Sequence, residues 1–139
     1  MAQESVSVSG CAEGVREVAR AFDAFSASNG LPGSLVRAVH VALDELLSNT
    51  VRSGFAPGQT GRIEVRFEIA EGSLDVLIVD DGIPFDPLAR ADPDTTAPIE
   101  ARPIGGLGIY LVRQLVDGVD YERLGRENRL HLKKRIIGV

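Results

Sequence analysis

An alternating stretch, GRIEVRFEIA at residues 61–70, constrains the fold of this chain more than any other feature. Every second residue from Ile63 to Ile69 is apolar and the residues between them are charged. This alternation is typical of a strand with one buried and one solvent-exposed face. The short turn EGS leads into a second apolar run at residues 74–79, so the two runs predict a hairpin. A sheet of this kind needs helices to cover only one of its faces.

Helical spacing appears in three further parts of the sequence. Residues 12–28 predict a first helix whose apolar stripe is Val15, Val18, Phe22 and Phe25. A second helix is expected between Pro32 and about Gly54, with a buried stripe of Val36, Val39, Leu43, Leu46 and Thr50. A third opens at the glycines of GGLGIYLVRQLVD, after a proline-rich stretch without periodicity that predicts a long loop at residues 84–105.

A short strand around residues 5–9 and two closing strands around 119–124 and 129–135 complete the order β-α-α-β-β-loop-α-β-β. This order predicts an α+β fold, a two-layer sandwich in which a mixed, mostly antiparallel sheet carries helices on one face. Strands and helices do not alternate regularly, which disfavours a Rossmann fold. The length of 139 residues fits one domain over residues 1–139 with a single core.

Charge and cysteine content argue against several kinds of partner and site. A net charge of −5 and an isoelectric point near 5.0 disfavour nucleic acid or a membrane as direct partner, because both attract basic surfaces. No apolar run approaches the roughly 20 residues that span a bilayer. The single cysteine, Cys11, makes no internal disulfide, so a cytoplasmic protein is expected. Cys11, His40 and His131 are far apart in sequence, which disfavours a zinc site.

The second predicted helix carries the stretch ALDELLSNTV, in which Glu45 and Asn49 lie four residues apart and therefore on one helical face. The amide oxygen of Asn49 is a hard ligand suited to Mg²⁺. Glu45 has the chemistry of a general base toward a hydroxyl or a water. The alternative interpretation is a solvated helix face, where Glu and Asn are common.

The other two motifs flank the long loop. In VDDGIPFDP, Asp80 or Asp81 ends a strand and can accept a hydrogen bond from an exocyclic amine, while Gly82 lets a ligand ring approach the backbone. In GGLG, glycines precede a helix whose amide groups attract phosphate. A charged turn and a flexible loop end are the respective alternatives.

The order of these motifs, E-x-x-x-N on a helix, D-x-G after a strand, a long loop, then G-x-G opening a helix, resembles the GHKL nucleotide-binding fold. Within that fold the chain looks like the small anti-sigma factor serine/threonine kinases of bacteria. DDGIPFDP and GGLGIYLVRQLVD are especially similar to that group. The similarity covers nearly the whole chain.

The resemblance implies a role for each motif residue. Glu45 would be the catalytic base, Asn49 would bind Mg²⁺, and Asp80 rather than Asp81 would hold the adenine of ATP beside Gly82. The phosphates would lie near Gly106, Leu107 and Gly108, under an ATP lid at about residues 86–105. The implied partners are a STAS-type anti-anti-sigma protein as substrate, a sigma factor, and a second copy of the chain in a homodimer.

Two departures from the relatives keep a second function open. The nearest basic residue to GGLG, the second glycine motif, is Arg102, and Pro103 and Ile104 lie between them. The last strand reads ENRL where many relatives have a Gly-Thr pair. The alternative is a non-catalytic module in which ATP orders the lid and tunes affinity for a partner. The presence of Glu45 favours the kinase, because a pure binding module needs no base.

Overall fold

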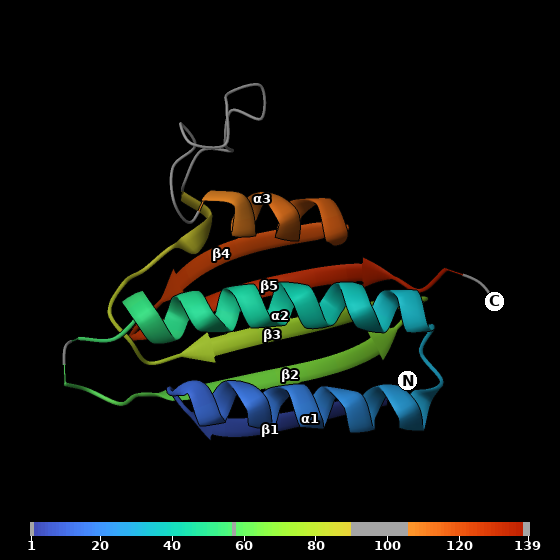
Figure 1. Cartoon of the computed structure of the whole chain (residues 1–139), viewed down its shortest axis with the longest axis horizontal. Coiled ribbons are helices and arrows are strands. Elements are labelled where there is room, and N and C mark those ends of the chain that lie inside the picture. The colour runs from blue at the N-terminus through green and yellow to red at the C-terminus, as the bar shows by residue number, and fades with distance from the viewer. Residues whose placement is uncertain (1, 57, 90–105, 138–139) are drawn as a thin grey trace.

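The computed structural model describes residues 2–56, 58–89 and 106–137. Its strands are β1 (Ala2–Ser9), β2 (Arg62–Ala70), β3 (Ser73–Asp80), β4 (Gly118–Leu124) and β5 (Glu127–Arg135). They form one sheet in the order β1-β2-β3-β5-β4, and each neighbouring pair is antiparallel (Figure 1). The predicted hairpin is therefore present as β2 and β3, and the last strand of the chain lies inside the sheet rather than at its edge.

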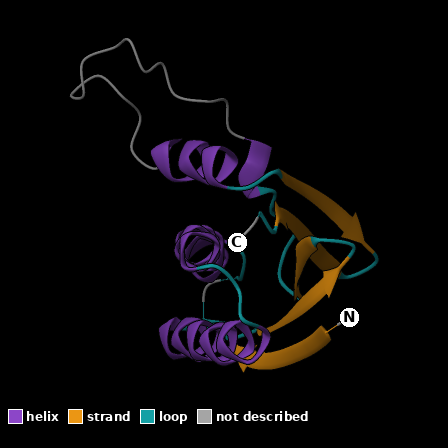
Figure 2. Cartoon of the chain, turned by 90° about the vertical axis from the view of Figure 1, so that its right-hand side faces the viewer, coloured by secondary structure: helices purple, strands orange, loops and turns teal. Residues whose placement is uncertain are grey.

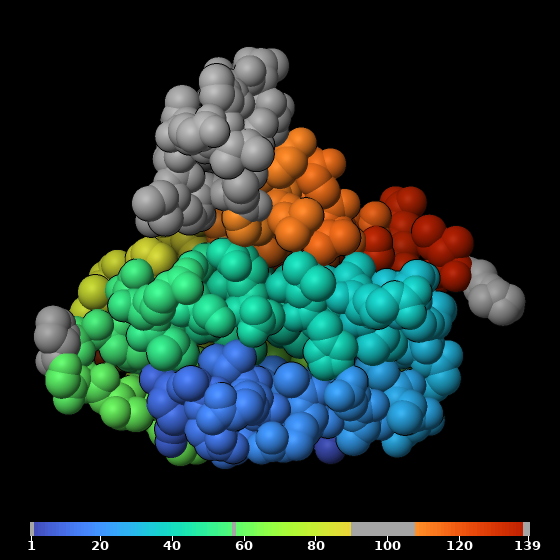
Figure 3. Space-filling model, viewed as in Figure 1, coloured from blue at the N-terminus to red at the C-terminus, as the bar shows by residue number. Residues whose placement is uncertain are grey.

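The helices are α1 (Ala12–Asn29), α2 (Gly33–Ser53) and α3 (Gly106–Leu115), with a short 3₁₀ helix η1 (Pro87–Ala89) after β3. All three α-helices lie on the same face of the sheet (Figure 2), and in the space-filling view they hide most of that face (Figure 3). The predicted two-layer α+β sandwich is thus confirmed. None of the helices in the described ranges is both long and apolar enough to cross a bilayer.

The predicted break between the first two helices falls at NGLPG, as expected from its residues. Gly30 caps α1 with a φ of 62°, a left-handed conformation that glycine adopts without steric cost. Pro32 precedes α2 in an extended conformation, and its ring cannot continue the preceding helix. Two helices joined this tightly must run antiparallel, which places α1 beside α2 on the sheet (Figure 1).

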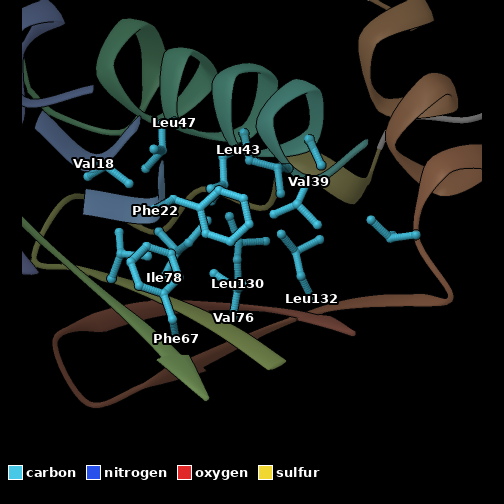
Figure 4. Close-up of a cluster of buried hydrophobic side chains, with 14 of the residues drawn as sticks. Val18, Phe22, Val39, Leu43, Leu47, Phe67, Val76, Ile78, Leu130 and Leu132 are labelled. Atoms are coloured by element: carbon cyan, nitrogen blue, oxygen red, sulfur yellow. The ribbon is translucent and has the colours of Figure 1, made fainter. Parts of the chain in front are cut away.

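One hydrophobic core fills the space between the two layers (Figure 4). Phe22 of α1 packs against Phe67 of β2 with ring centroids 5.3 Å apart, and both side chains are fully buried. The buried stripe of α2 is wider than predicted, because it includes Leu35 and Leu47, whereas Val36 is only partly buried. A helix covered on both flanks buries a broader stripe than one lying alone on a sheet.

The opposite face of the sheet carries the charged residues that alternate with the core, as the strand pattern predicted. Arg66 pairs with Glu64 at 2.9 Å, and His131 lies 3.2 Å from Asp75 of the neighbouring strand. These side chains are a third to a half exposed. Exposed pairs of this kind contribute little to stability, so the core face holds the fold together.

Candidate functional site

The two polar residues predicted on the second helix lie together between α2 and α3. Glu45 and Asn49 are both partly buried, and Nδ2 of Asn49 donates to Oε1 of Glu45 at 3.3 Å. Gly108 of α3 approaches the same carboxylate so closely that an added Cβ would lie 1.9 Å from Oε1. The Glu45 carboxylate is therefore held against the backbone of the second glycine motif, which a solvated helix face would not require.

The donor set around Asn49 fits a magnesium ion that also binds phosphate. Within the described residues no three His, Cys, Asp or Glu side chains converge on a common point, so that part of the chain supplies no complete cage. Mg²⁺ commonly takes one or two protein oxygens and completes its shell with substrate phosphates and water. Oδ1 of Asn49 now accepts a short hydrogen bond from the exposed side chain of Arg52, which must withdraw or turn to phosphate when a cation binds.

Gly108→Ala is expected to displace the Glu45 carboxylate while the fold remains intact. The added methyl group meets the flexible end of a side chain, not backbone, so the side chain moves at little cost in stability. The phosphate transfer that the resemblance implies should then fall about 100-fold, because small misplacements of a reacting group cost about that much. The measurement is transfer rate together with thermal unfolding.

The matched control for that change is Gly118→Ala. A Cβ at Gly118 meets only the Cβ of Lys133, at 3.9 Å, so neither rate nor stability should change much. Equal activity in Gly108→Ala and wild type would contradict the role given to this contact.

The second cluster lies where β3 ends. Asp80 is only 4% exposed, and its Oδ1 accepts hydrogen bonds from the Gly82 amide and from Nδ2 of Asn128, both at 2.9 Å. Burial raises the pKa of the Asp80 carboxyl, and the hydrogen bonds from Asn128 and Gly82 partly offset that rise. Among the described residues Oδ2 has no hydrogen-bond partner. The carboxylate therefore offers one free acceptor to a ligand.

The neighbouring carboxylate has a different position. Asp81 is exposed, and its Oδ1 accepts a hydrogen bond from the backbone amide of Arg62 at 2.9 Å, at the start of β2. The two adjacent aspartates therefore differ in role: Asp80 is buried at the end of β3, and Asp81 ties that end to the neighbouring strand β2. This geometry favours Asp80 over Asp81 as the ligand-binding residue.

Asp81→Ala is expected to destabilise the protein by about 1 kcal/mol, the usual contribution of one hydrogen bond, with nucleotide affinity nearly unchanged. Chemical denaturation and a nucleotide titration check the two halves of this statement. A loss of affinity as large as that of an Asp80 substitution would contradict the division between the two carboxylates.

Helix α2 connects the two clusters. The amide of Ile83 donates to the carbonyl of Gly54 at 2.9 Å, just beyond the end of α2. A Cβ on Gly82 would lie 1.9 Å from that same carbonyl oxygen, so only glycine fits there. Gly54 follows Glu45 by nine residues, which is roughly 14 Å along a helix. The two clusters therefore lie roughly that far apart along α2.

The second glycine motif is described in part. Gly106 and Leu107 belong to the first turn of α3, which leaves their amide groups without intrahelical acceptors. Of the predicted lid at residues 86–105, the structure describes 86–89, and Arg113 of α3 donates to the carbonyl of Leu88 at 2.8 Å. Residues 90–105, including Arg102, lie outside the described residues.

Three residues near Asp80 were not among the predicted site residues. Asn128 is 2% exposed and contacts Asp80 from β5, and Tyr121 of β4 donates to Oδ1 of Asn128. Arg123 of β4 donates to the carbonyl of Gly82 at 2.9 Å. In the sequence only the departure at ENRL, which contains Asn128, pointed to this region. The contact of Asn128 with Asp80 could not be predicted from it, because that contact depends on the pairing of β3 with β5.

Comparison with known proteins decides the family. Residues 9–134 match the family described as the histidine kinase-like ATPase domain. The chain belongs to this family. The description of the family implies use of ATP.

Similar sequences within this family include the serine-protein kinase RsbW of Listeria monocytogenes, 31% identical over 94 residues, and that of Bacillus licheniformis, 32% identical over 85 residues. These alignments cover 65% and 57% of this chain, and 60% and 52% of the relatives. The chain therefore aligns with only a little over half the length of those kinases.

Solved structures support the fold of the histidine kinase-like ATPase domain. The RsbU and RsbW domains of Rv1364c from Mycobacterium tuberculosis superpose with a TM-score of 0.71 at 17% identity, over 98% of this chain and 32% of that one. The histidine kinase AdeS of Acinetobacter baumannii gives a TM-score of 0.52 at 16% identity, over 99% of this chain and 70% of that one.

Proposed function

We propose that this protein is an ATP-dependent serine/threonine kinase that phosphorylates a STAS-type anti-anti-sigma protein and thereby controls the sequestration of a sigma factor. The observation that carries the proposal is the contact between Glu45 and Gly108, which holds a carboxylate at the start of α3, where the phosphates would lie. A module that only binds nucleotide has no use for a base in that place. The similarity to serine-protein kinases supports the same conclusion.

The residues divide the work as follows. Oδ2 of Asp80 accepts a hydrogen bond from the exocyclic amine of adenine, and the phosphates extend along α2 toward the amide groups of Gly106, Leu107 and Gly108. Asn49 would hold Mg²⁺, which neutralises phosphate charge when bound. Glu45 would accept the proton of the substrate serine as the serine oxygen bonds to the γ-phosphorus of ATP. The bond from that phosphorus to the β,γ-bridging oxygen breaks, and ADP leaves.

Phosphorylation gives the switch its physical basis. A phosphoserine carries about −1.5 to −2 charges near neutral pH, so the modified substrate no longer fits a surface that binds the neutral serine. This protein is itself acidic, with a net charge of −5, which increases the repulsion. The unmodified substrate would compete with the sigma factor, and we propose that both bind a homodimer of this chain in the cytoplasm.

The test combines the purified protein, Mg²⁺, γ-labelled ATP and a purified STAS-type protein from the same source. Label on one serine of the STAS protein, absent when that serine is alanine, is the expected result. Tight ATP binding without transfer would instead support the non-catalytic module. Absence of ATP binding would overturn the site. Light scattering of the same sample measures whether the chain is a dimer.

A further inference from the structure

Asn128 is the most completely bonded polar side chain near the candidate site. Its Nδ2 donates to Oδ1 of Asp80 at 2.9 Å and to the carbonyl of Ile83 at 2.7 Å. Its Oδ1 accepts from the amide of Phe85 at 3.2 Å and from the hydroxyl of Tyr121 at 2.5 Å. A side-chain amide has two donor hydrogens and two acceptor lone pairs, so every position of Asn128 is in use.

These bonds fix the orientation of the amide and separate it from direct ligand contact. If the amide were flipped, its amino group would face the amide hydrogen of Phe85, and donor would meet donor. Because all four positions are occupied, Asn128 has no free group for a nucleobase. Its influence on a ligand must therefore act through Asp80 and the segment that follows it.

The segment after Asp80 is held from several sides. Asn128 binds Ile83 and Phe85, Arg123 donates to the carbonyl of Gly82, and the amide of Ile83 donates to Gly54. Two groups donate to Oδ1 of Asp80: the amide of Gly82 within the segment, and Nδ2 of Asn128, which joins the carboxylate to Ile83 as well. Asn128 is buried, so water does not replace a bond that is lost.

We propose that Asn128 is a positioning residue that sets base selectivity by engaging Oδ1 of Asp80 and leaving Oδ2 for the exocyclic amine of adenine. The inference rests on the proposed function, in which Asp80 accepts that amine. Without Asn128 the carboxylate keeps only the Gly82 amide as a donor to Oδ1, so it turns more easily about its χ2 bond and Oδ2 is less firmly aimed at one place. Selectivity for an amine over a carbonyl at that position of the purine should then decrease.

The experiment compares the dissociation constants of ATP and inosine triphosphate, which carries a carbonyl where ATP carries the amine, for wild type and Asn128→Ala. We expect the preference for ATP to fall about 10-fold, as when one hydrogen bond to a charged group is lost. General damage to the pocket would weaken both nucleotides equally and leave their ratio unchanged. Asn29→Ala removes a side-chain amide that bonds only the carbonyl of Phe25 at the end of α1, and it is the matched control.

Asn128→Asp adds a readout that a purely structural role would not affect. The new carboxylate faces Oδ1 of Asp80, and two carboxylates in contact raise the pKa of one of them. When protonated, Asp at position 128 can donate the missing hydrogen bond. ATP affinity relative to wild type should therefore rise as the pH falls, by about 10-fold between the two protonation states.

The outcomes separate this inference from the proposed function. If wild type binds neither nucleotide, both are overturned. If wild type prefers ATP and the ratio is unchanged in Asn128→Ala, only the inference is overturned. If Asn128→Ala fails to fold, Tyr121→Phe takes its place, because it removes a single hydrogen bond to Asn128. Tyr121→Phe is expected to reduce the preference for ATP about 3-fold. An unchanged ratio in Tyr121→Phe, together with no pH effect in Asn128→Asp, also overturns the inference.

Discussion

Glu45→Gln is expected to reduce phosphate transfer by about 10³-fold, within the range attributed to general base catalysis, while ATP affinity stays within a few-fold of wild type. Glutamine keeps the size of the side chain and can still contact Asn49 and Gly108, but it cannot take a proton. The effect should therefore appear in the rate of transfer at saturating ATP. Rapid-mix labelling of a STAS-type substrate, together with calorimetric ATP titration, measures the two quantities.

The control for this change lies one position earlier. Asp44 is an exposed carboxylate on the same helix, so Asp44→Asn makes the same chemical replacement away from Gly108 and should leave transfer unchanged. Full activity of Glu45→Gln would contradict the kinase mechanism, even if ATP binds tightly. Loss of ATP binding in Glu45→Gln would instead show that the carboxylate positions nucleotide or metal.

Asp80→Asn is expected to change the preferred nucleotide from ATP to inosine triphosphate. Oδ1 of residue 80 must remain an acceptor, because Gly82 and Asn128 both donate to it. The new amino group then takes the place of Oδ2 and meets the adenine amine as donor against donor. Wild type is mismatched with inosine triphosphate and Asp80→Asn is mismatched with ATP, and each mismatch costs about 2 kcal/mol. The ratio of the two dissociation constants should therefore change by about 10³-fold. Calorimetric titration with both nucleotides measures it.

The same substitution has a predictable effect on stability. Burial raises the pKa of Asp80 in the folded protein, so the folded state binds a proton more tightly than the unfolded state. The free energy of unfolding therefore falls as the pH rises from the unfolded pKa through the folded one, and stays lower above it. We expect Asp80→Asn to be more stable than wild type near pH 7, with the gain vanishing by about pH 3.

Thermal unfolding across this pH range checks that expectation, and Asp81→Asn is the control because that carboxylate is exposed. A gain in stability combined with loss of ATP preference would identify Asp80 as a residue kept for binding. A loss of stability near neutral pH would contradict the sign derived from its burial.

Local patterns in the sequence were sufficient for most of the fold. The alternation around Phe67 predicted β2 and the solvent-exposed face of the sheet, and the NGLPG break predicted where α1 ends and α2 begins. Such signals concern residues that are close in the chain. The insertion of β5 between β3 and β4 was not predicted, since it depends on pairing such as Asp80 with Asn128 across 48 positions.

The candidate site shows the same division. The spacing of Glu45 and Asn49 placed both on one face of α2, because helical geometry fixes that relation. The contact of Glu45 with Gly108 and the four hydrogen bonds of Asn128 arise only when separate elements pack together. Val15 and Val36 were expected in buried stripes and are only partly buried, because neighbouring helices decide how far each stripe is covered.

The bond from Ile83 to the carbonyl of Gly54 has a consequence for local opening of the protein. That bond closes the last turn of α2 onto the segment after β3, and β3 is a central strand of the sheet. The segment is therefore tied both to the end of a long core helix and to a central strand. We expect the amide hydrogens of Gly82 and Ile83 to exchange with solvent as slowly as those of the core. The part of the site around Asp80 then belongs to the last unit of the molecule to unfold.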